Sequence, residues 1–189
     1  MNIVKIDGRE YNIIAAEEAD YVRKVAEFVR DLAAELNVPA PKILMEPGRS
    51  IVADAGMTLY TAGTVKRIPG YKNYVSVDGG MADNPRYALY RSPYTVLSAE
   101  RPECSGESFE ASVVGRCCES GDILQEGVTL PADIGRGEVL DVLTTGAYNY
   151  SMASNYNRVP RPPVVIIGAN GPYIAVRRET WEDLLTKDL

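Results

Sequence analysis

The pattern of apolar and polar residues predicts a long amphipathic helix over residues 17–36. Its acidic residues gather at its start, where carboxylates interact favourably with the helix dipole. Asn37 and the two prolines that follow it predict the end of this helix. The apolar positions recur at steps of three and four residues, and they are Val22, Val25, Val29, Leu32 and Leu36.

A short apolar strand is predicted directly after this helix. It covers residues 42–46 and is ended by Pro47-Gly48. A helix that leads through a short loop into a buried strand is the unit of an α/β barrel or a layered α/β sheet. The unit occurs here only once, so we expect a remnant of such an architecture.

The character of the chain changes after Arg49. Runs of β-branched and aromatic residues follow, separated by clusters of Gly, Pro, Asn and Asp, and this pattern is typical of a β-sandwich or β-barrel. The predicted fold class is therefore mainly β with few helices (α+β). The runs cover residues 57–68, 74–77, 94–98, 111–118, 139–144, 164–167 and 173–177.

Turn and cap residues mark further elements and a domain boundary. Asp7-Gly8 predicts a hairpin within residues 3–14, and residues 169–171 predict a second one. Thr180 and an acid three residues later are a variant of the capping box and predict a final helix. We place the boundary near Ser50, which gives an N-terminal segment of residues 1–50 and a β-rich domain of residues 51–189.

Composition and charge narrow the possible partners and compartments. The 189 residues are 46% hydrophobic and 24% charged, with a formal net charge of −6 and a pI near 4.8. An acidic chain of this kind is not expected to bind nucleic acid or an anionic membrane. No run of 18 apolar residues exists and the first 20 residues carry five acids, so we expect no signal peptide, no spanning helix and a cytoplasmic location.

The scarcity of metal-binding and nucleophilic side chains restricts the chemistry. The chain has no His and three Cys, two of which are the adjacent Cys117 and Cys118. Serine–histidine and cysteine–histidine catalysis are thereby excluded, and neither a disulfide framework nor a zinc site is expected. Chemistry must use a thiol, a carboxylate, Lys, Tyr or a borrowed cofactor.

A first candidate site is the tetrapeptide Glu46-Pro47-Gly48-Arg49, which follows the predicted strand. In α/β barrels this end of a strand carries the active-site loops. Gly48 permits close approach of the backbone to a phosphate, and Arg49 offers a fork for a carboxylate or phosphate. A plain turn followed by a surface Arg remains the alternative for this tetrapeptide taken alone.

Arg86 and Tyr90 form a second candidate. If residues 83–90 are helical, these two side chains share a face and can reach one anion together. An Arg stem lying over an aromatic ring at the surface is the alternative interpretation.

A third candidate is the pair Cys117 and Cys118. In an extended segment the two point to opposite sides, so only one can face a site, and burial as a small apolar residue is the usual role of such a Cys. Cys118, however, leads into Glu119 and Asp122. A neighbouring acid raises the pKa of a thiol, which favours a proton donor over a nucleophile.

The last candidate is a segment rich in Tyr and Asn. Tyr148, Tyr150 and Tyr156 alternate there with Asn, Gly and Ser. The segment is too polar for a core and too aromatic for an ordinary loop, so we expect a ligand site or a subunit interface.

Taken together, these blocks resemble the diaminopimelate decarboxylases, pyridoxal-phosphate enzymes with an alanine-racemase-like fold. The resemblance extends from about residue 17 to the end of the chain. It implies a cofactor at the mouth of an N-terminal α/β barrel, with a β-rich C-terminal domain of the partner subunit closing the site. The matching blocks are EPGRSIV (46–52), DGGMADNPRYALY (78–90), CCESGD (117–122), TTGAYNYSMASNYNR (144–158) and PRPPVV (160–165).

The resemblance implies roles for individual residues. Cys118 corresponds to the proton donor that reaches across the dimer. A neutral thiol suits that step, because a proton must replace the lost carbon dioxide. The implied cofactor-binding residues are Glu46, Pro47, Gly48, Arg49 and Tyr148. The implied ligands of the substrate meso-diaminopimelate are Arg49, Arg86, Tyr90, Glu119 and Tyr148.

The resemblance is incomplete at the N-terminal side. Such enzymes hold the cofactor on a Schiff-base Lys, and none of the six Lys here lies in a block that resembles that site. A single helix and strand cannot close an eight-stranded barrel. We therefore interpret the chain as the C-terminal portion of such an enzyme, with only the last helix and strand of the barrel, and expect the isolated chain to be inactive and to form negligible Schiff base.

Two other interpretations stay open. One is a non-catalytic β-domain that dimerises or binds a partner through exposed aromatic residues. The other is decarboxylation of a related amino acid. The expected partners are a small-molecule substrate and either a second copy of the chain or a separate barrel portion. The hairpin of residues 3–14 is interpreted as a substitute for the strand that the family takes from its own N-terminus.

Overall fold

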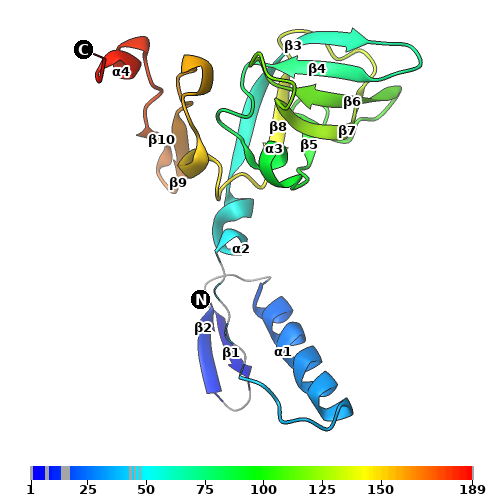
Figure 1. The fold of residues 1–189 in the computed structure, drawn as a ribbon, viewed down its shortest axis with the longest axis vertical. Coiled ribbons are helices and arrows are strands. Elements are labelled where there is room, and N and C mark those ends of the chain that lie inside the picture. The colour runs from blue at the N-terminus through cyan, green and yellow to red at the C-terminus, as the bar shows by residue number, and fades with distance from the viewer. Residues whose placement is uncertain are drawn as a thin grey trace. The chain divides into compact units, whose positions relative to one another are not determined.

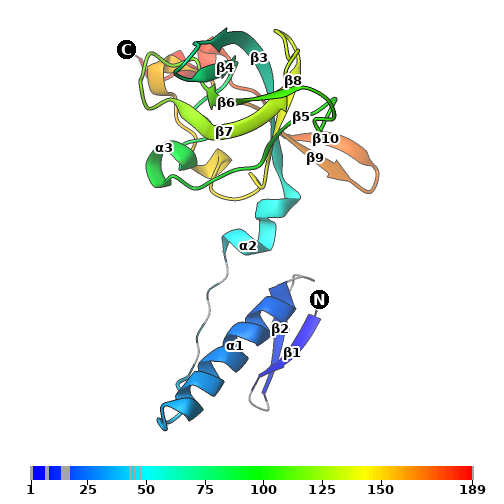
Figure 2. The same ribbon diagram turned by 90° about the vertical axis from the view of Figure 1, so that its right-hand side faces the viewer.

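The computed structural model describes residues 2–6, 9–13, 18–42, 44, 46 and 48–188. The chain divides into two compact units, Met1–Ala53 and Asp54–Leu189. Figures 1 and 2 show the elements of both units.

The N-terminal unit contains a hairpin and a long helix. Strands β1 (Asn2–Ile6) and β2 (Arg9–Ile13) pair antiparallel, with Ile6 opposite Arg9. The predicted turn residues between them, Asp7-Gly8, lie outside the described residues. Helix α1 runs from Glu18 to Glu35, which confirms the helix predicted from the apolar spacing.

The end of α1 shows why the helix stops where the sequence predicted. Asn37 has a left-handed backbone with φ of 54°. The N–H of Val38 bonds to the carbonyl of Ala33 at 2.9 Å, and the N–H of Asn37 bonds to that of Ala34 at 3.1 Å. These are the two hydrogen bonds of a Schellman motif, which satisfies carbonyls that the helix leaves without partners.

The strand predicted over residues 42–46 is not formed at its described positions. Lys42, Leu44 and Glu46 belong to no helix or strand, and Leu44 is 78% exposed. A strand needs a neighbour to satisfy its backbone groups, and none of the described strands pairs with this segment. A short helix, α2 (Arg49–Val52), follows and continues into the 3-10 turn η1 (Ala53–Ala55).

The C-terminal unit is built on one six-stranded sheet with the order β5-β8-β3-β4-β6-β7. All neighbouring strands are antiparallel except β4 and β6, which are parallel. The strands at the two ends of this order, β5 and β7, contact each other, so the sheet curls into a nearly closed barrel (Figure 2). The bounds are β3 Met57–Arg67, β4 Asn73–Val77, β5 Val96–Ser98, β6 Ser108–Val114, β7 Ile123–Pro131 and β8 Val139–Leu143.

The core of this unit comes from alternate positions of the strands. Along β8, Leu140 and Val142 are fully buried while the residues between them are only partly so. Burying each such side chain stabilises the fold by about 1.5–3 kcal/mol. The mainly β fold class predicted from the sequence is thereby confirmed. The largest fully buried apolar side chains are Leu124, Leu130, Leu140, Val75, Val113 and Val142.

Two sequence expectations about this sheet need correction. Strand β7 was not predicted, although Leu124, Val128 and Leu130 on it are buried. Its polar residues and Gly127 interrupt the β-branched run that marked the other strands. The run expected to continue to Cys118 ends at Val114, because the chain bends at residues 116–118.

The remaining elements include a second hairpin and a capped helix. Strands β9 (Val164–Gly168) and β10 (Gly171–Val176) form the hairpin predicted around residues 169–171. Helix α4 (Trp181–Leu185) begins with the predicted capping box of Thr180 and Asp183. Three short helical segments complete the unit: α3 (Arg86–Tyr90), η2 (Tyr150–Met152) and η3 (Tyr156–Arg158). Within the described part of the chain, no helix is both long and apolar enough to span a bilayer.

Candidate functional site

Arg86, Tyr90 and Tyr148 meet in the C-terminal unit. The guanidinium carbon of Arg86 lies 5.4 Å from the centroid of the Tyr90 ring and 5.7 Å from that of the Tyr148 ring. Both distances are within the range of cation–π attraction. Arg86 and Tyr90 are on α3, as the spacing predicted, and Tyr148 comes from a segment that follows β8. Two sequence blocks far apart thus form one cluster.

The guanidinium of Arg86 keeps donor capacity for a ligand. Its Nη2 donates to the hydroxyl of Ser92 at 3.3 Å. Its Nε is buried and has no hydrogen-bond partner among the described residues. An unpaired buried donor is costly, and a carboxylate is the preferred partner of a guanidinium. Nε itself is closed to solvent, whereas the Tyr90 and Tyr148 side chains beside it are 60% and 48% exposed.

Helix α3 is fixed to the sheet by Tyr87. The Tyr87 hydroxyl donates to Oε2 of Glu126 on β7 at 2.9 Å, and Lys72 pairs with the other oxygen at 2.9 Å. Lys72 and then Tyr87 lower the pKa of Glu126, so this carboxylate stays charged. Tyr87 itself is buried, whereas Arg86 and Tyr90 on the same helix are free to face a ligand.

Tyr148 sits on a strained backbone. Its φ is 59°, and that of Thr144 in the same segment is 62°. Residues with a Cβ seldom adopt this left-handed region, which costs roughly 1–2 kcal/mol. Strain of this kind is retained mainly where the surroundings enforce it, and it is frequent at functional sites.

The strained segment is held by the start of β3. Thr145 donates its N–H to the carbonyl of Gly56 at 2.9 Å, and its hydroxyl accepts from that of Thr58 at 2.8 Å. A Cβ on Gly56 would lie 2.5 Å from the Cα of Gly146, so the two glycines allow the backbones to touch. On the other side of Tyr148, the buried Asn149 accepts a hydrogen bond from the hydroxyl of Tyr94 at 3.2 Å.

Cys117 and Cys118 lie in a turn beyond β6, not in an extended strand. The expectation that they point to opposite sides of a strand therefore does not apply. Cys118 is exposed and Cys117 is partly buried. Burial, followed by the charge of Asp122, raises the pKa of the Cys117 thiol to about 11. Cys118 is thus the more accessible thiol of the pair.

Glu119 is held as a charged group in the same turn. Its Oε1 accepts from the N–H of Gly121 at 3.0 Å and from the hydroxyl of Ser120 at 3.3 Å. The Gly121 hydrogen bond is the main cause that lowers the pKa of Glu119, and the Tyr156 hydroxyl adds to it. Tyr156 therefore belongs to the surroundings of Glu119, a contact that the sequence did not indicate.

Sequence reasoning gave no structural role to two acids of this unit, the partly buried Asp83 and the buried Asp122. Asp83 accepts from the hydroxyl of Tyr60 at 2.5 Å and from the N–H of Gly80 at 2.9 Å. Burial raises the pKa of Asp83, and burial together with Asp83 raises that of Tyr60. The second acid, Asp122, is 3% exposed. The only sign of these acids' roles in the sequence was their position close to glycines, Gly79-Gly80 before Asp83 and Gly121 before Asp122.

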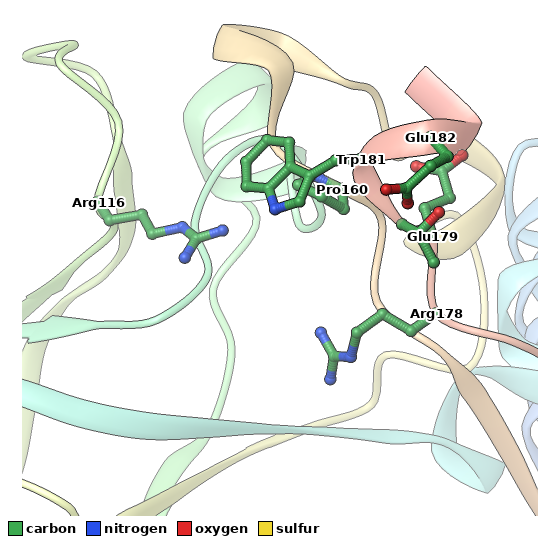
Figure 3. A pocket seen from close by; sticks show the side chains of 7 residues that line it. Arg116, Pro160, Arg178, Glu179, Trp181 and Glu182 are labelled. Carbon is green, nitrogen blue, oxygen red and sulfur yellow. The ribbon is translucent and has the colours of Figure 1, made fainter. Parts of the chain in front are cut away.

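The turn of residues 115–122, here called the cysteine turn, contributes Arg116 to the lining of an open hollow of about 410 Å³ (Figure 3). The guanidinium groups of Arg116 and Arg178 extend into this space, and the indole of Trp181 lies at its edge. Glu179 on its wall is engaged by Arg161, which donates to it through Nε at 2.8 Å. The lining residues are Arg116, Pro160, Arg178, Glu179, Thr180, Trp181 and Glu182.

The other predicted site residues lie in the N-terminal unit. Glu46 is exposed and Arg49 is partly buried at the start of α2. Gly48 precedes α2 and accepts the N–H of Ile51 at 3.2 Å. Pro47 lies outside the described residues. The C-terminal unit alone therefore brings together Arg86, Tyr90 and Tyr148, and it carries the Cys118–Glu119 turn.

Comparisons with known proteins point in one direction. The family model of the pyridoxal-dependent decarboxylase C-terminal sheet domain matches residues 21–146. The chain is 48% identical to a diaminopimelate decarboxylase of Bacillus subtilis over 172 residues, which are 90% of this chain and 38% of that protein. It is 41% identical to that of Mycobacterium bovis, with 90% and 39% covered.

Solved structures agree. The structure of diaminopimelate decarboxylase from M. jannaschii superposes with a TM-score of 0.73 at 32% identity and covers 88% of this chain and 38% of its own. The enzyme from Helicobacter pylori, in complex with L-lysine, gives a TM-score of 0.70 at 27% identity, with 95% and 40% covered. The chain thus spans about two fifths of the length of these relatives.

Proposed function

This chain belongs to the pyridoxal-dependent decarboxylase family through its C-terminal sheet domain, and from that premise we propose that it is the C-terminal portion of a diaminopimelate decarboxylase. The proposed reaction converts meso-diaminopimelate to L-lysine and carbon dioxide. The proposed location is the cytoplasm. The curated relatives at 41–48% identity carry this name, which supports the assignment.

The observation that carries the proposal is the convergence of Arg86, Tyr90 and Tyr148. A guanidinium flanked by two phenol rings, with its Nε buried and unpaired among the described residues, suits a substrate carboxylate. Helix α3 supplies Arg86 and Tyr90, and a segment distant in the sequence supplies Tyr148. We assign Arg86 and Tyr90 to the substrate carboxylate and Tyr148 to both substrate and cofactor.

Cys118 is assigned as the proton donor. Its thiol is exposed on the turn beyond β6, so a bound substrate can approach it. A protonated thiol delivers a proton to the substrate carbon that has lost its carboxyl group. Glu119, which follows it, remains negatively charged and is suited to an ammonium group at the distal end of the substrate.

The chain fits part of a pyridoxal-phosphate site. When bound, the cofactor supplies an electron sink for the electron pair that decarboxylation leaves behind. The exposed Tyr148 ring, held on a strained backbone, offers a surface to a flat ring, while Glu46, Pro47, Gly48 and Arg49 are assigned to the cofactor phosphate. Lys72 is engaged with Glu126, and we propose that the anchoring Lys comes from a barrel portion outside this chain.

Reconstitution tests the assignment. The chain is mixed with a separately produced barrel portion of the Bacillus subtilis relative, and carbon dioxide release from meso-diaminopimelate is measured. We expect activity only in the mixture. Arg86→Ala should lower kcat/KM at least 100-fold, because a charge-assisted carboxylate contact is lost. Arg136→Ala, an exposed Arg on a loop of the same unit, is the matched control and should leave it unchanged.

The outcome that contradicts the assignment is equally specific. If the chain binds the barrel portion but the mixture releases no carbon dioxide, the chain does not have the proposed activity. An Arg86→Ala variant with the kinetics of Arg136→Ala would remove Arg86 from the substrate site.

A non-catalytic role in dimerisation is the second candidate, and the β9–β10 hairpin favours it. Five large side chains of this two-stranded element are 42–81% exposed: Val165, Ile166, Ile167, Tyr173 and Ile174. Exposed apolar patches of this kind mark interaction surfaces. Light scattering of the chain alone and with the barrel portion separates the candidates, since dimerisation without restored activity supports the second one.

A further inference from the structure

A single buried carboxylate joins two loops of the C-terminal unit. Asp122 is 3% exposed. Its Oδ1 accepts the N–H of Met81 at 2.6 Å, and its Oδ2 accepts the N–H of Cys117 at 2.7 Å. Met81 and Asp122 are 41 positions apart in the sequence. Hydrogen bonds from backbone N–H groups to a buried carboxylate are short and strong, so this contact fixes the two loops against each other.

Two glycines make room for this carboxylate. A Cβ built on Gly115 would lie 2.2 Å from Oδ2 of Asp122, and one built on Gly80 would lie 2.5 Å from Oδ1. Neither position can carry a side chain unless the carboxylate moves. Gly80 and Gly115 belong to the same two loops that the carboxylate joins, so both loops are shaped to accept it.

Backbone hydrogen bonds close the cysteine turn around Asp122. The carbonyl of Asp122 accepts from Gly115 at 2.9 Å, and its N–H donates to the carbonyl of Glu119 at 3.1 Å. The N–H of Arg116 donates to the carbonyl of Gly79 at 3.1 Å, which adds a second link between the loops. Cys118 and Glu119 thus lie on a turn whose two ends are tied at Asp122.

We propose that Asp122 is a positioning residue: its carboxylate holds the turn that carries Cys118 and Glu119 against the loop of residues 79–84 that leads into α3. The inference rests on the proposed function, in which Cys118 and α3 act on one substrate. We assign Asp122 to positioning and not to proton transfer, because it is 3% exposed and both of its oxygens are engaged by backbone N–H groups.

A nitroxide label on Cys118 tests this arrangement in the full chain. Cys104 and Cys117 are replaced by Ser, and the loss of the Met81 amide signal caused by the label is measured by NMR. We expect strong broadening, because both loops touch the same carboxylate. In Asp122→Asn the amide NH₂ group faces one of the two N–H donors, so the broadening at Met81 should fall at least two-fold. Asp133→Asn, an exposed carboxylate whose side chain is 77% accessible, is the matched control and should keep the wild-type value.

Unchanged broadening in folded Asp122→Asn would overturn the proposal. If that variant does not fold, Gly80→Ala takes its place, since it displaces the carboxylate without removing its charge and should give the same loss. In the wild-type chain, the amides of Met81 and Cys117 should exchange hydrogen at least ten-fold more slowly than in an unstructured peptide, and free exchange at both would also overturn it. None of these readouts needs turnover, so a failed reconstitution would remove the proposed function and leave this result intact.

Discussion

The barrel-like sheet and the loops that connect its strands differ in backbone conformation and in the polarity of what they bury. In the sheet, buried apolar residues alternate with partly exposed ones, and no non-glycine residue of its described strands has a positive φ. The loops hold Thr144 and Tyr148 in left-handed backbones and enclose the partly buried Asp83 and the buried Asp122. They also leave Arg86 Nε unpaired among the described residues. Stability is therefore concentrated in the strands, and the capacity to bind a charged ligand is concentrated in the loops.

The sharpest way to test this division is to damage the sheet. Leu140 is fully buried in β8. Leu140→Ala removes apolar contacts and leaves a cavity, so the free energy of unfolding should fall by about 2–5 kcal/mol. Denaturant titration measures the change. Leu89→Ala, at a position on α3 that is 61% exposed, is the control and should change it by less than about 0.5 kcal/mol. Equal effects of the two changes would show that the sheet is not the main source of stability.

Lowering the pH should have a smaller effect on the free energy of unfolding, through an ion pair near the C-terminus. Arg161 lowers the pKa of Glu179 from 4.5 to about 2. Because the folded pKa is the lower one, the pair stabilises the fold above pH 4.5, and this contribution is lost as the pH falls toward 2. Arg161 is 37% accessible, so solvent screening limits the contribution to about 1 kcal/mol.

Glu179→Gln provides the measurement. It should lower the free energy of unfolding by that amount at pH 6, and the difference from the wild type should disappear near pH 2. A difference that persists at pH 2 would mean that Glu179 contributes by packing and not by its charge.

The smallest expected effect is a gain in stability. Thr144 is a β-branched residue with φ of 62°. Thr144→Gly relieves the strain but adds flexibility to the unfolded chain, so the free energy of unfolding should rise by about 0.5 kcal/mol. Thermal unfolding measures it, with Thr129→Gly in strand β7 as the control that should lose stability. A loss in Thr144→Gly would show that the backbone of this loop is not strained.

The sequence predicted those parts of the fold that depend on local patterns. The spacing of Val22 to Leu36 predicted α1, Asn37 predicted its end, and Thr180 with Asp183 predicted α4. Strand β7 was missed because Gln125, Glu126 and Gly127 interrupt its apolar pattern. Its register is decided by pairing with β6, which a local pattern cannot show.

The candidate site also has a part that local sequence patterns predicted and a part that they could not. The helical spacing of Arg86 and Tyr90 was visible in the sequence, whereas their meeting with Tyr148 depends on how the sheet folds. The turn of Cys118 was mistaken for a strand, because Asp122 ends the extended run through contacts with Met81 and Cys117. Long-range hydrogen bonds of this kind leave no periodic signal.

The parallel pairing of β4 with β6 has a consequence for how the molecule assembles. Parallel neighbours cannot be joined by a tight turn, and the connection between them must be long. Here it includes α3 and β5, so Arg86 and Tyr90 lie on the long connection that the topology requires. Contacts between distant parts of a chain form slowly. We therefore expect α3 to reach its final place only in the rate-limiting step that closes the barrel, so that the cluster of Arg86, Tyr90 and Tyr148 and the sheet are completed in one kinetic step.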